Sequence, residues 1–380
     1  MLYSDHGIRP AARALLARPR HALLAAVVTG VAVGSLLAGL GGIDGQVLTE
    51  PREADPVFAQ APLRPLSISL NDPVRSYVDR FTGPHARTMS VYLTRSGRYE
   101  GMIRSMLRER NMPEELFYLS MIESGFVPTA RSPAQAVGLW QFIPETGRRY
   151  GLRIDRYVDE RRDPERSTDA ALRYLEYMYG RFGSWQLAAA GYNTGENRVG
   201  RIMREVTGDE RGADEDYWRI RHRLPRETQN YVPQILAAAL IGEQPELFGL
   251  DAVERWSPLA TEPVRVPPGT SLAALAAAAG VGEEEIRRLN PSLLRGITPP
   301  DTEYVVHVPE GRGVVTLANL GEVMLASRSA PVVRTHSVVS GESLWVIARR
   351  TGSSVSELQR ANGLGVRSTL RPGQRLTIPG

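Results

Sequence analysis

The chain contains no cysteine and no lysine. The absence of cysteine excludes disulfides, thiolate metal sites, cysteine nucleophiles and attachment of a lipid through a cysteine thiol. All 46 basic residues are therefore arginine, and the formal net charge is only +4. These arginines form no dense stripe with interleaved aromatic residues, so the sequence predicts no nucleic-acid partner.

Histidine is also scarce. The six histidines are scattered along the chain, and no pair has the spacing of metal ligands. We therefore expect neither a metal site nor a cofactor. What the chain does contain is enough apolar sequence for a core: 42% of its 380 residues are hydrophobic. That length predicts two or three domains.

The N-terminal region has the layout of an export segment. Four arginines precede a run of uncharged, mostly apolar residues at 22–40. A secretory signal has this order with a shorter apolar run, whereas a membrane-spanning helix needs roughly twenty such residues. We expect residues 1–42 to be a signal peptide or an N-terminal membrane anchor, and either one exports the remainder. Residues 43–66, rich in proline and polar side chains, are expected to be a linker.

The body of the chain changes character near residue 260. Residues 67–250 carry apolar side chains at three-to-four spacing, which predicts a compact all-α domain. Beyond it, "GTSLAALAAAAGVGEEEIRRLN" (269–290) aligns without gaps on "GESLWVIARRTGSSVSELQRAN" (341–362). Short β-like segments flank each copy, so we expect two βααβ modules at 262–310 and 334–380, with a linker at 311–333.

Glu123 is the residue that calls for an explanation. It ends the apolar stretch of "LSMIESGFVP" (119–128). Taken alone, such a residue is most often a solvated carboxylate at the end of a helix. In apolar surroundings its pKa would be raised, and it could act as a general acid. Three further segments bear on the choice: "AVGLWQFIPETGRRYG" (136–151), "AAAGYNTGENRV" (188–199) and "ETQNYVPQIL" (227–236).

In this order, the four segments resemble the lysozyme-like domain of family 1 lytic transglycosylases, and most closely the membrane-bound lytic murein transglycosylase D type. The resemblance covers about residues 90–245. The repeats are similar to LysM, a peptidoglycan-binding module, with the first copy a degenerate version. The fold implied is an all-α lysozyme-like domain followed by two small βααβ modules.

The resemblance also implies a chemistry. Glu123 would be the catalytic acid that protonates the glycosidic oxygen between N-acetylmuramic acid and N-acetylglucosamine, and then a base for the muramyl C6 hydroxyl. An intramolecular attack leaves a 1,6-anhydro sugar and needs no second carboxylate. Residues expected to hold the sugar or orient Glu123 are Ser124, Gln141, Tyr192, Asn193 and Tyr231. Residues expected at the LysM sugar groove are Gly341, Ser343, Leu344, Asn362 and Gly363.

Four further residues receive other interpretations. Trp345 is expected in the core of the second module, and Glu227 is expected to be an ordinary surface acid. Gln135 and Ser120 depart from the family pattern, which commonly has a small residue and a proline at these positions.

Two alternatives remain open. The same fold with a second carboxylate could hydrolyse the glycan as goose-type lysozymes do, and an inactive domain could serve as a peptidoglycan-binding scaffold. The expected partner in every case is the glycan strand of peptidoglycan. The expected location is the periplasm, with membrane contact only through the N-terminal segment, anchored in the inner membrane if residues 22–40 are retained.

Overall fold

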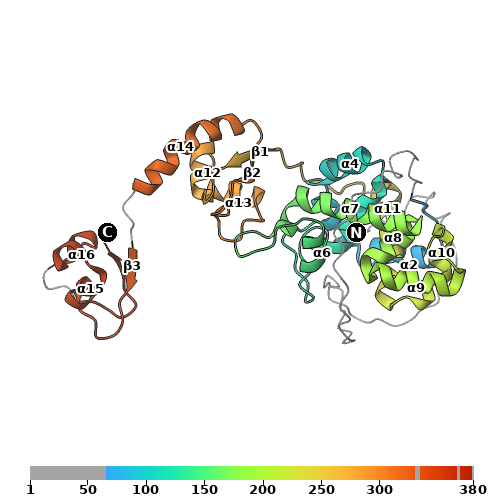
Figure 1. Ribbon diagram of the computed structural model, residues 1–380, viewed down its shortest axis with the longest axis horizontal. Helices are drawn as coiled ribbons and strands as arrows, with labels where there is room; N and C mark the ends of the chain where they lie inside the picture. The colour runs from blue at the N-terminus through green and yellow to red at the C-terminus, as the bar shows by residue number, and fades with distance from the viewer. Residues whose placement is uncertain (1–65, 330–333, 366–368, 379–380) are drawn as a thin grey trace, which may run out of the picture. The chain divides into compact units, whose positions relative to one another are not determined.

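The computed structural model describes residues 66–329, 334–365 and 369–378 (Figure 1). The predicted signal or anchor, and almost all of the linker that follows it, lie outside these residues. The described residues fall into two compact units, one of 66–272 with 282–313 and one of 273–281 with 314–378. None of the helices in the described ranges is both long and apolar enough to cross a membrane.

The region before residue 250 is helical throughout its regular structure, as predicted. Its α-helices are α2 (Asp72–Thr82), α3 (Ala86–Ser96), α4 (Glu100–Glu109), α5 (Phe117–Ser124), α6 (Pro144–Arg149), α7 (Pro164–Phe182), α8 (Trp185–Thr194), α9 (Glu196–Thr207), α10 (Asp214–Ile220) and α11 (Arg226–Glu243). Short 3₁₀ turns lie at η2 (Glu114–Leu116), η3 (Glu160–Arg162), η4 (Arg221–Arg223) and η5 (Pro245–Phe248).

Helix α8 is at the centre of this core. It is built from small residues, Ala188 to Gly191, and all of them are buried. The backbone of α8 can therefore approach α7 closely: a Cβ added at Gly191 would lie 2.9 Å from the Phe182 ring. Helix α7 begins at Pro164, because Asp163 caps it by accepting from the backbone N–H groups of Glu165 and Arg166.

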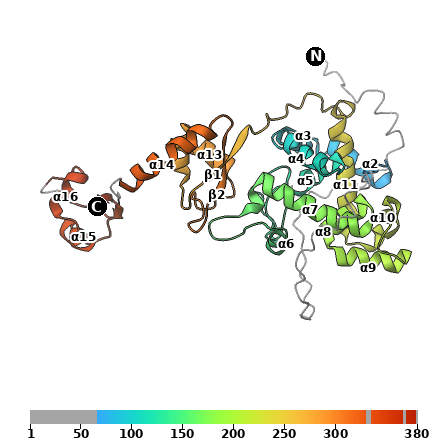
Figure 2. The same ribbon diagram turned by 45° about the horizontal axis from the view of Figure 1, so that its top comes forward.

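Helix α11 packs against α2, α5 and α8, and Figure 2 shows it as the long helix beside them. It contains Pro233, which has no N–H to donate to the carbonyl of Gln229 one turn earlier. Instead, Arg221 Nε donates a hydrogen bond to Gln229 O at 2.6 Å, and the Tyr217 hydroxyl donates to the same oxygen at 3.3 Å. The hydrogen bond that proline removes is thus replaced from neighbouring helices.

The C-terminal region holds two strand pairs and five helices among its described residues. The first copy consists of β1 (Thr261–Val266), α12 (Leu272–Ala279), α13 (Glu283–Leu289) and β2 (Tyr304–Pro309), with β1 and β2 antiparallel. The second consists of β3 (Arg334–Ser337), α15 (Leu344–Thr351), α16 (Val355–Ala361) and β4 (Arg375–Ile378), again with antiparallel strands. Residues expected as a linker between them form α14 (Gly313–Ser329).

The same asparagine closes both copies. The amide of Asn290 donates to Ile286 O and His307 O and accepts from His307 N. Asn362 makes the same three bonds with Leu358 O, Thr377 O and Thr377 N. The predicted groove residue Asn362 therefore uses its amide to fasten α16 to β4.

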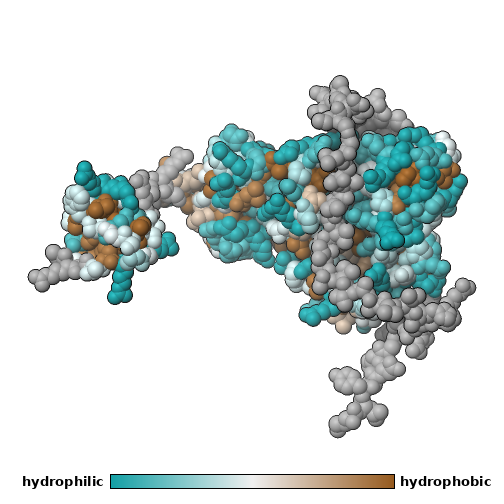
Figure 3. All heavy atoms as spheres, turned by 90° about the horizontal axis from the view of Figure 1, so that it is seen from below, coloured by the Kyte–Doolittle hydropathy of each residue, from teal (hydrophilic) through white to brown (hydrophobic). Residues whose placement is uncertain are grey.

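The prediction that Trp345 lies in the core is wrong. Its side chain is 60% exposed, and Val339 and Val346 nearby in sequence are also exposed. The small core of this copy is aliphatic instead, built around Ile347, Leu358 and Leu376. The space-filling view accordingly shows hydrophobic atoms at the surface of the small C-terminal body (Figure 3).

Candidate active site

Helix α5 places Glu123 in its last turn. The helix is apolar and almost wholly buried up to Met121. It stops at Gly125, which caps it in the left-handed conformation with φ 57°. Only glycine fits there, because an added Cβ would lie 2.2 Å from the Tyr92 ring. The chain therefore turns immediately after Glu123 and Ser124.

The Glu123 carboxyl accepts a hydrogen bond from the Tyr231 hydroxyl of α11. The residue keeps some exposed surface, but protein atoms surround its carboxyl. Burial raises the pKa of Glu123 to about 8, with a further increase from the negative charge of Glu227 and an opposing decrease from the Tyr231 hydrogen bond. At neutral pH Glu123 is thus largely protonated and able to donate a proton.

Glu227 belongs to this site and is not the surface acid that the sequence predicts. Its carboxylate accepts from Asn193 Nδ2 at 3.1 Å. The other end of the same amide accepts from the buried Thr228 hydroxyl at 2.7 Å. Asn193 is thereby held in one orientation by two consecutive residues of α11.

The segment from Ala130 to Phe142 packs beside these helices, and its backbone carbonyls accept hydrogen bonds from their side chains. Leu139 O accepts from the hydroxyls of Ser120 and Ser124, at 3.1 and 2.9 Å. Trp140 O accepts from the Tyr192 hydroxyl at 2.7 Å. Ser120 thus has a specific partner where the family pattern has proline. We call residues 130–142 the catalytic loop.

Backbone strain is concentrated in and just before this loop. Among the described residues, only four other than glycine have positive φ, and three of them are Phe126, Gln135 and Gln141. Left-handed backbone is costly for such side chains and persists where the surroundings enforce it. Gln141 uses its amide within the loop, donating to Gly138 O at 2.9 Å. The position of Gln135, where a small residue is the expectation, is one that glycine would satisfy with less strain.

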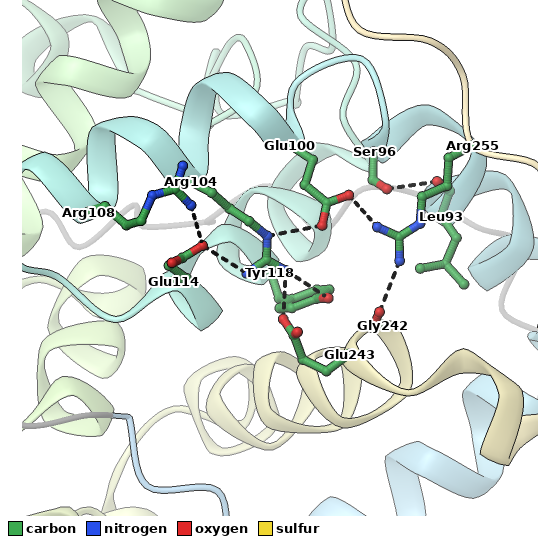
Figure 4. A network of polar contacts seen from close by, with 10 residues as sticks. All are labelled: Leu93, Ser96, Glu100, Arg104, Arg108, Glu114, Tyr118, Gly242, Glu243 and Arg255. Atoms are coloured by element: carbon green, nitrogen blue, oxygen red, sulfur yellow. Dashed lines mark hydrogen bonds and ion pairs between the residues drawn. The ribbon is translucent and has the colours of Figure 1, made fainter.

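A polar cluster at the far ends of α5 and α11 fixes these two helices (Figure 4). Its centre is Arg104 of α4, which bonds Glu100 at 3.0 Å, Glu243 at 2.6 Å and the Tyr118 hydroxyl at 3.3 Å. Tyr118 lies on α5 and Glu243 ends α11. The cluster therefore joins the two helices that carry Glu123 and Tyr231.

Sequence comparison agrees with this arrangement. The transglycosylase SLT domain family matches residues 101–213, the LysM domain family matches 336–379, and the LysM-like domain of lytic transglycosylase MltD matches 260–319. Membrane-bound lytic murein transglycosylase D of Escherichia coli strain K12 is 33% identical over 322 residues, which are 82% of this chain and 70% of that protein.

Two more distant relatives were also found. Peptidoglycan transglycosylase gp16 of Escherichia phage T7 is 31% identical over 156 residues, 40% of this chain and 11% of that protein. Among solved structures, an inactive variant of lytic transglycosylase Slt from Pseudomonas aeruginosa is 26% identical, with a TM-score of 0.32 over 38% of this chain and 24% of that one.

The helical domain that holds Glu123 is a transglycosylase SLT domain of the lysozyme-like fold. The chain as a whole belongs to the family of membrane-bound lytic murein transglycosylase D. It is a lytic murein transglycosylase that acts on peptidoglycan. The predicted fold class, an all-α catalytic domain followed by two small α+β modules, is confirmed.

The structure brings the predicted site residues together in different ways. The Tyr231 hydroxyl donates to the Glu123 carboxyl, whereas the Tyr192 hydroxyl donates to Trp140 O. Burial and the charge of Glu123 both raise the pKa of Tyr192. Ser124 and Gln141 bond the loop backbone and not the acid. The sequence predicts Glu227 as a surface acid and gives no signal for Thr228, since a charged and a hydroxyl residue at the start of a helix are typical of solvated ends.

Proposed function

We propose that Glu123 cleaves the β-1,4 bond between N-acetylmuramic acid and N-acetylglucosamine without water. Tyr231 donates to Glu123 Oε1, so the protonated acid carries its own proton on Oε2. That proton passes to the glycosidic oxygen as the bond to the muramyl C1 breaks. The ionised Glu123 then takes the proton of the muramyl C6 hydroxyl as its oxygen attacks C1, which leaves a 1,6-anhydro end.

The observation that supports this proposal most directly is the environment of Glu123. A general acid must hold its proton near neutral pH, and burial raises the pKa of Glu123 to about 8. The bond from Tyr231 stabilises the ionised form that appears after proton transfer. One carboxyl can therefore serve in both steps.

Hydrolysis is the second candidate, because Glu227 lies close enough to raise the pKa of Glu123. In that reaction Glu227 would activate a water molecule in place of the C6 hydroxyl. Its bond to Asn193 Nδ2 favours a different role, that of orienting a sugar-binding amide.

The test is to digest purified sacculi and weigh the released muropeptides. Anhydro-muramyl ends support our proposal, and reducing ends would establish hydrolysis. E123Q should lower turnover by at least about a thousandfold, since it removes both the acid and the base. The matched control is E145Q, which changes an exposed carboxylate of α6 and should leave turnover unchanged.

The raised pKa of Glu123 also predicts a pH dependence. Turnover should decrease as pH rises through about 8, because the acid loses its proton. The free energy of unfolding should also decrease as the pH rises. Between pH 4.5, the ordinary pKa of a glutamate, and about pH 8, the folded state holds a proton on Glu123 that the unfolded state has lost. Stability therefore decreases as the pH rises across this window. E123Q should therefore stabilise the protein more at about pH 9 than at about pH 4, by on the order of 2–4 kcal/mol in chemical denaturation.

The remaining parts of the proposal concern placement. The LysM repeats would hold glycan strands near the catalytic domain, with Gly341, Ser343, Leu344 and Gly363 shaping the groove of the second copy. The chain would act in the periplasm, with residues 1–42 as its export segment. Fractionation of cells that express the whole chain tests this location: recovery from the cytoplasm would contradict it.

A further inference from the structure

A seam of backbone hydrogen bonds joins the catalytic domain to the first repeat. We define it by residues 153–160 on the catalytic side and 292–304 on the repeat side. Asp159 N donates to Ser292 O at 2.9 Å, and Leu294 N donates to Tyr157 O at 2.8 Å. Between these bonds, Val158 and Leu293 form an antiparallel bridge with both side chains buried. Paired backbone and apolar burial are typical of a fixed contact.

A buried acid lies at the end of this seam. Glu160 is 4% exposed, and its carboxylate accepts from the Tyr304 hydroxyl of the repeat at 2.9 Å and from Arg153 N at 2.7 Å. Arg166 supplies the positive charge at 3.3 Å. A buried carboxylate is tolerated only when it is fully paired. Tyr304, itself 6% exposed, is therefore needed to satisfy an acid of the catalytic domain.

The seam continues into the catalytic loop through one arginine. Asp159, which pairs with Ser292 through its backbone, binds Arg161 through both carboxylate oxygens at 2.8 Å. The remaining arm of the Arg161 guanidinium donates to Gln135 O at 2.8 Å and to Phe142 O at 2.9 Å. These two carbonyls lie on either side of the strained part of the loop. Gly138 also packs on the Arg161 carbonyl so closely that no side chain would fit.

The loop in turn contacts the residues around Glu123, through Leu139 O with Ser120 and Ser124 and through Trp140 O with Tyr192. From this continuous set of contacts we propose that the first repeat is a brace for the catalytic loop, with Arg161 as the positioning residue that joins the two. Its role is to keep the loop in its strained conformation against the residues that flank Glu123. This inference rests on the proposed role of Glu123.

The same residues are poorly available for glycan binding. Tyr304 and Ser292 are buried in the seam, and the Asn290 amide is occupied by backbone partners. This part of the surface of the first repeat therefore packs against the catalytic domain of the same chain.

The test uses the full-length chain and two conservative variants. R161K keeps the charge but cannot bind Asp159 with two nitrogens while reaching two carbonyls. Y304F removes only the hydroxyl that satisfies Glu160. The matched control is E165Q, at the rim of the same contact, where the carboxylate is 62% exposed and 3.8 Å from His307.

Hydrogen–deuterium exchange of residues 130–142 is the first readout, and it does not depend on activity. We expect faster exchange there in R161K and in Y304F, and parental exchange in E165Q. We also expect kcat on murein strands to fall by about tenfold in R161K with little change in KM, and the alkaline limb of the pH profile to shift to lower pH as water reaches Glu123.

Three outcomes would overturn the brace. These are parental exchange in both variants, loss of sacculus binding with unchanged kcat, and an effect of E165Q equal to that of Y304F. The proposed role of Glu123 fails separately, if E123Q retains parental turnover. Since exchange of the loop is measured without substrate, it supports or overturns the loop's dependence on the seam whichever result E123Q gives.

Discussion

The two repeats of the C-terminal region share a fold but use their surfaces differently. Both fasten their second helix to their last strand with one asparagine, Asn290 or Asn362. At the start of the last strand the first copy has the buried Tyr304. The second copy has Gln374 at the matching position, directly before β4, and its side-chain oxygen accepts from Arg371 N in its own turn. On the first helix, the second copy exposes Trp345 where the first has alanine. A repeat can thus keep the asparagine that joins its second helix to its last strand while its surface residues take on different contacts.

The largest effect that we expect concerns the shared asparagine, and it sharpens the comparison. N290A and N362A should each destabilise their own repeat by about 3 kcal/mol, because three backbone groups lose their partner. Denaturant unfolding of each variant measures this. N319A is the control, since its amide makes one 3.2 Å bond to Ala278 O. If either variant unfolds at the same denaturant concentration as the parent, the asparagine does not stabilise both copies in the same way.

The next test swaps the residues at the matching positions 304 and 374 of the two copies. Y304Q puts the residue of the second copy into the seam, and we expect a loss of about 2 kcal/mol because buried Glu160 loses a hydrogen bond and a cavity forms. The reciprocal Q374Y changes a partly exposed position, and we expect a change within about 0.5 kcal/mol. Thermal unfolding of both variants gives the comparison. Equal losses would contradict a special use of Tyr304.

The smallest effect on stability should come from the exposed tryptophan. W345A should change the free energy of unfolding by less than about 0.5 kcal/mol, because the side chain lies outside the aliphatic core. If the second copy binds glycan through this face, the affinity for sacculi falls by about tenfold, since aromatic rings bury large apolar area on ligands. Co-sedimentation with sacculi measures the affinity, with A273W as the reciprocal change in the first copy.

How far the sequence predicts the molecule depends on the range of the contacts involved. Glu123 and Tyr231 could be found because each lies in a recognisable segment whose order along the chain is typical of the family. Trp345 was misplaced because a large aromatic residue at helical spacing usually indicates a core, and here Ile347 fills that role. Glu227 was assigned to the surface, since only the folded chain brings it near Glu123 and Asn193.

The seam was the least predictable part. Glu160 and Tyr304 are separated by 144 positions, and neither lies in a segment that resembles a site. In the sequence Arg161 is one of two consecutive arginines in a polar stretch, although its side chain is buried and each guanidinium nitrogen has a hydrogen-bond partner. Charged residues that are buried by distant partners have no periodic signature, so only the structure shows them.

The cluster around Arg104 has a consequence for any alkaline titration of this enzyme. In the described part of the chain its cations, like every side-chain cation other than histidine, are guanidinium groups, which keep their charge far above the pH at which amines lose theirs. An ordinary lysine loses its charge at about pH 10.4, so ion pairs made by lysine weaken as the pH approaches this value. Here the scaffold keeps its guanidinium charges across that range, so a loss of turnover there does not come from lysine ion pairs that lose their charge.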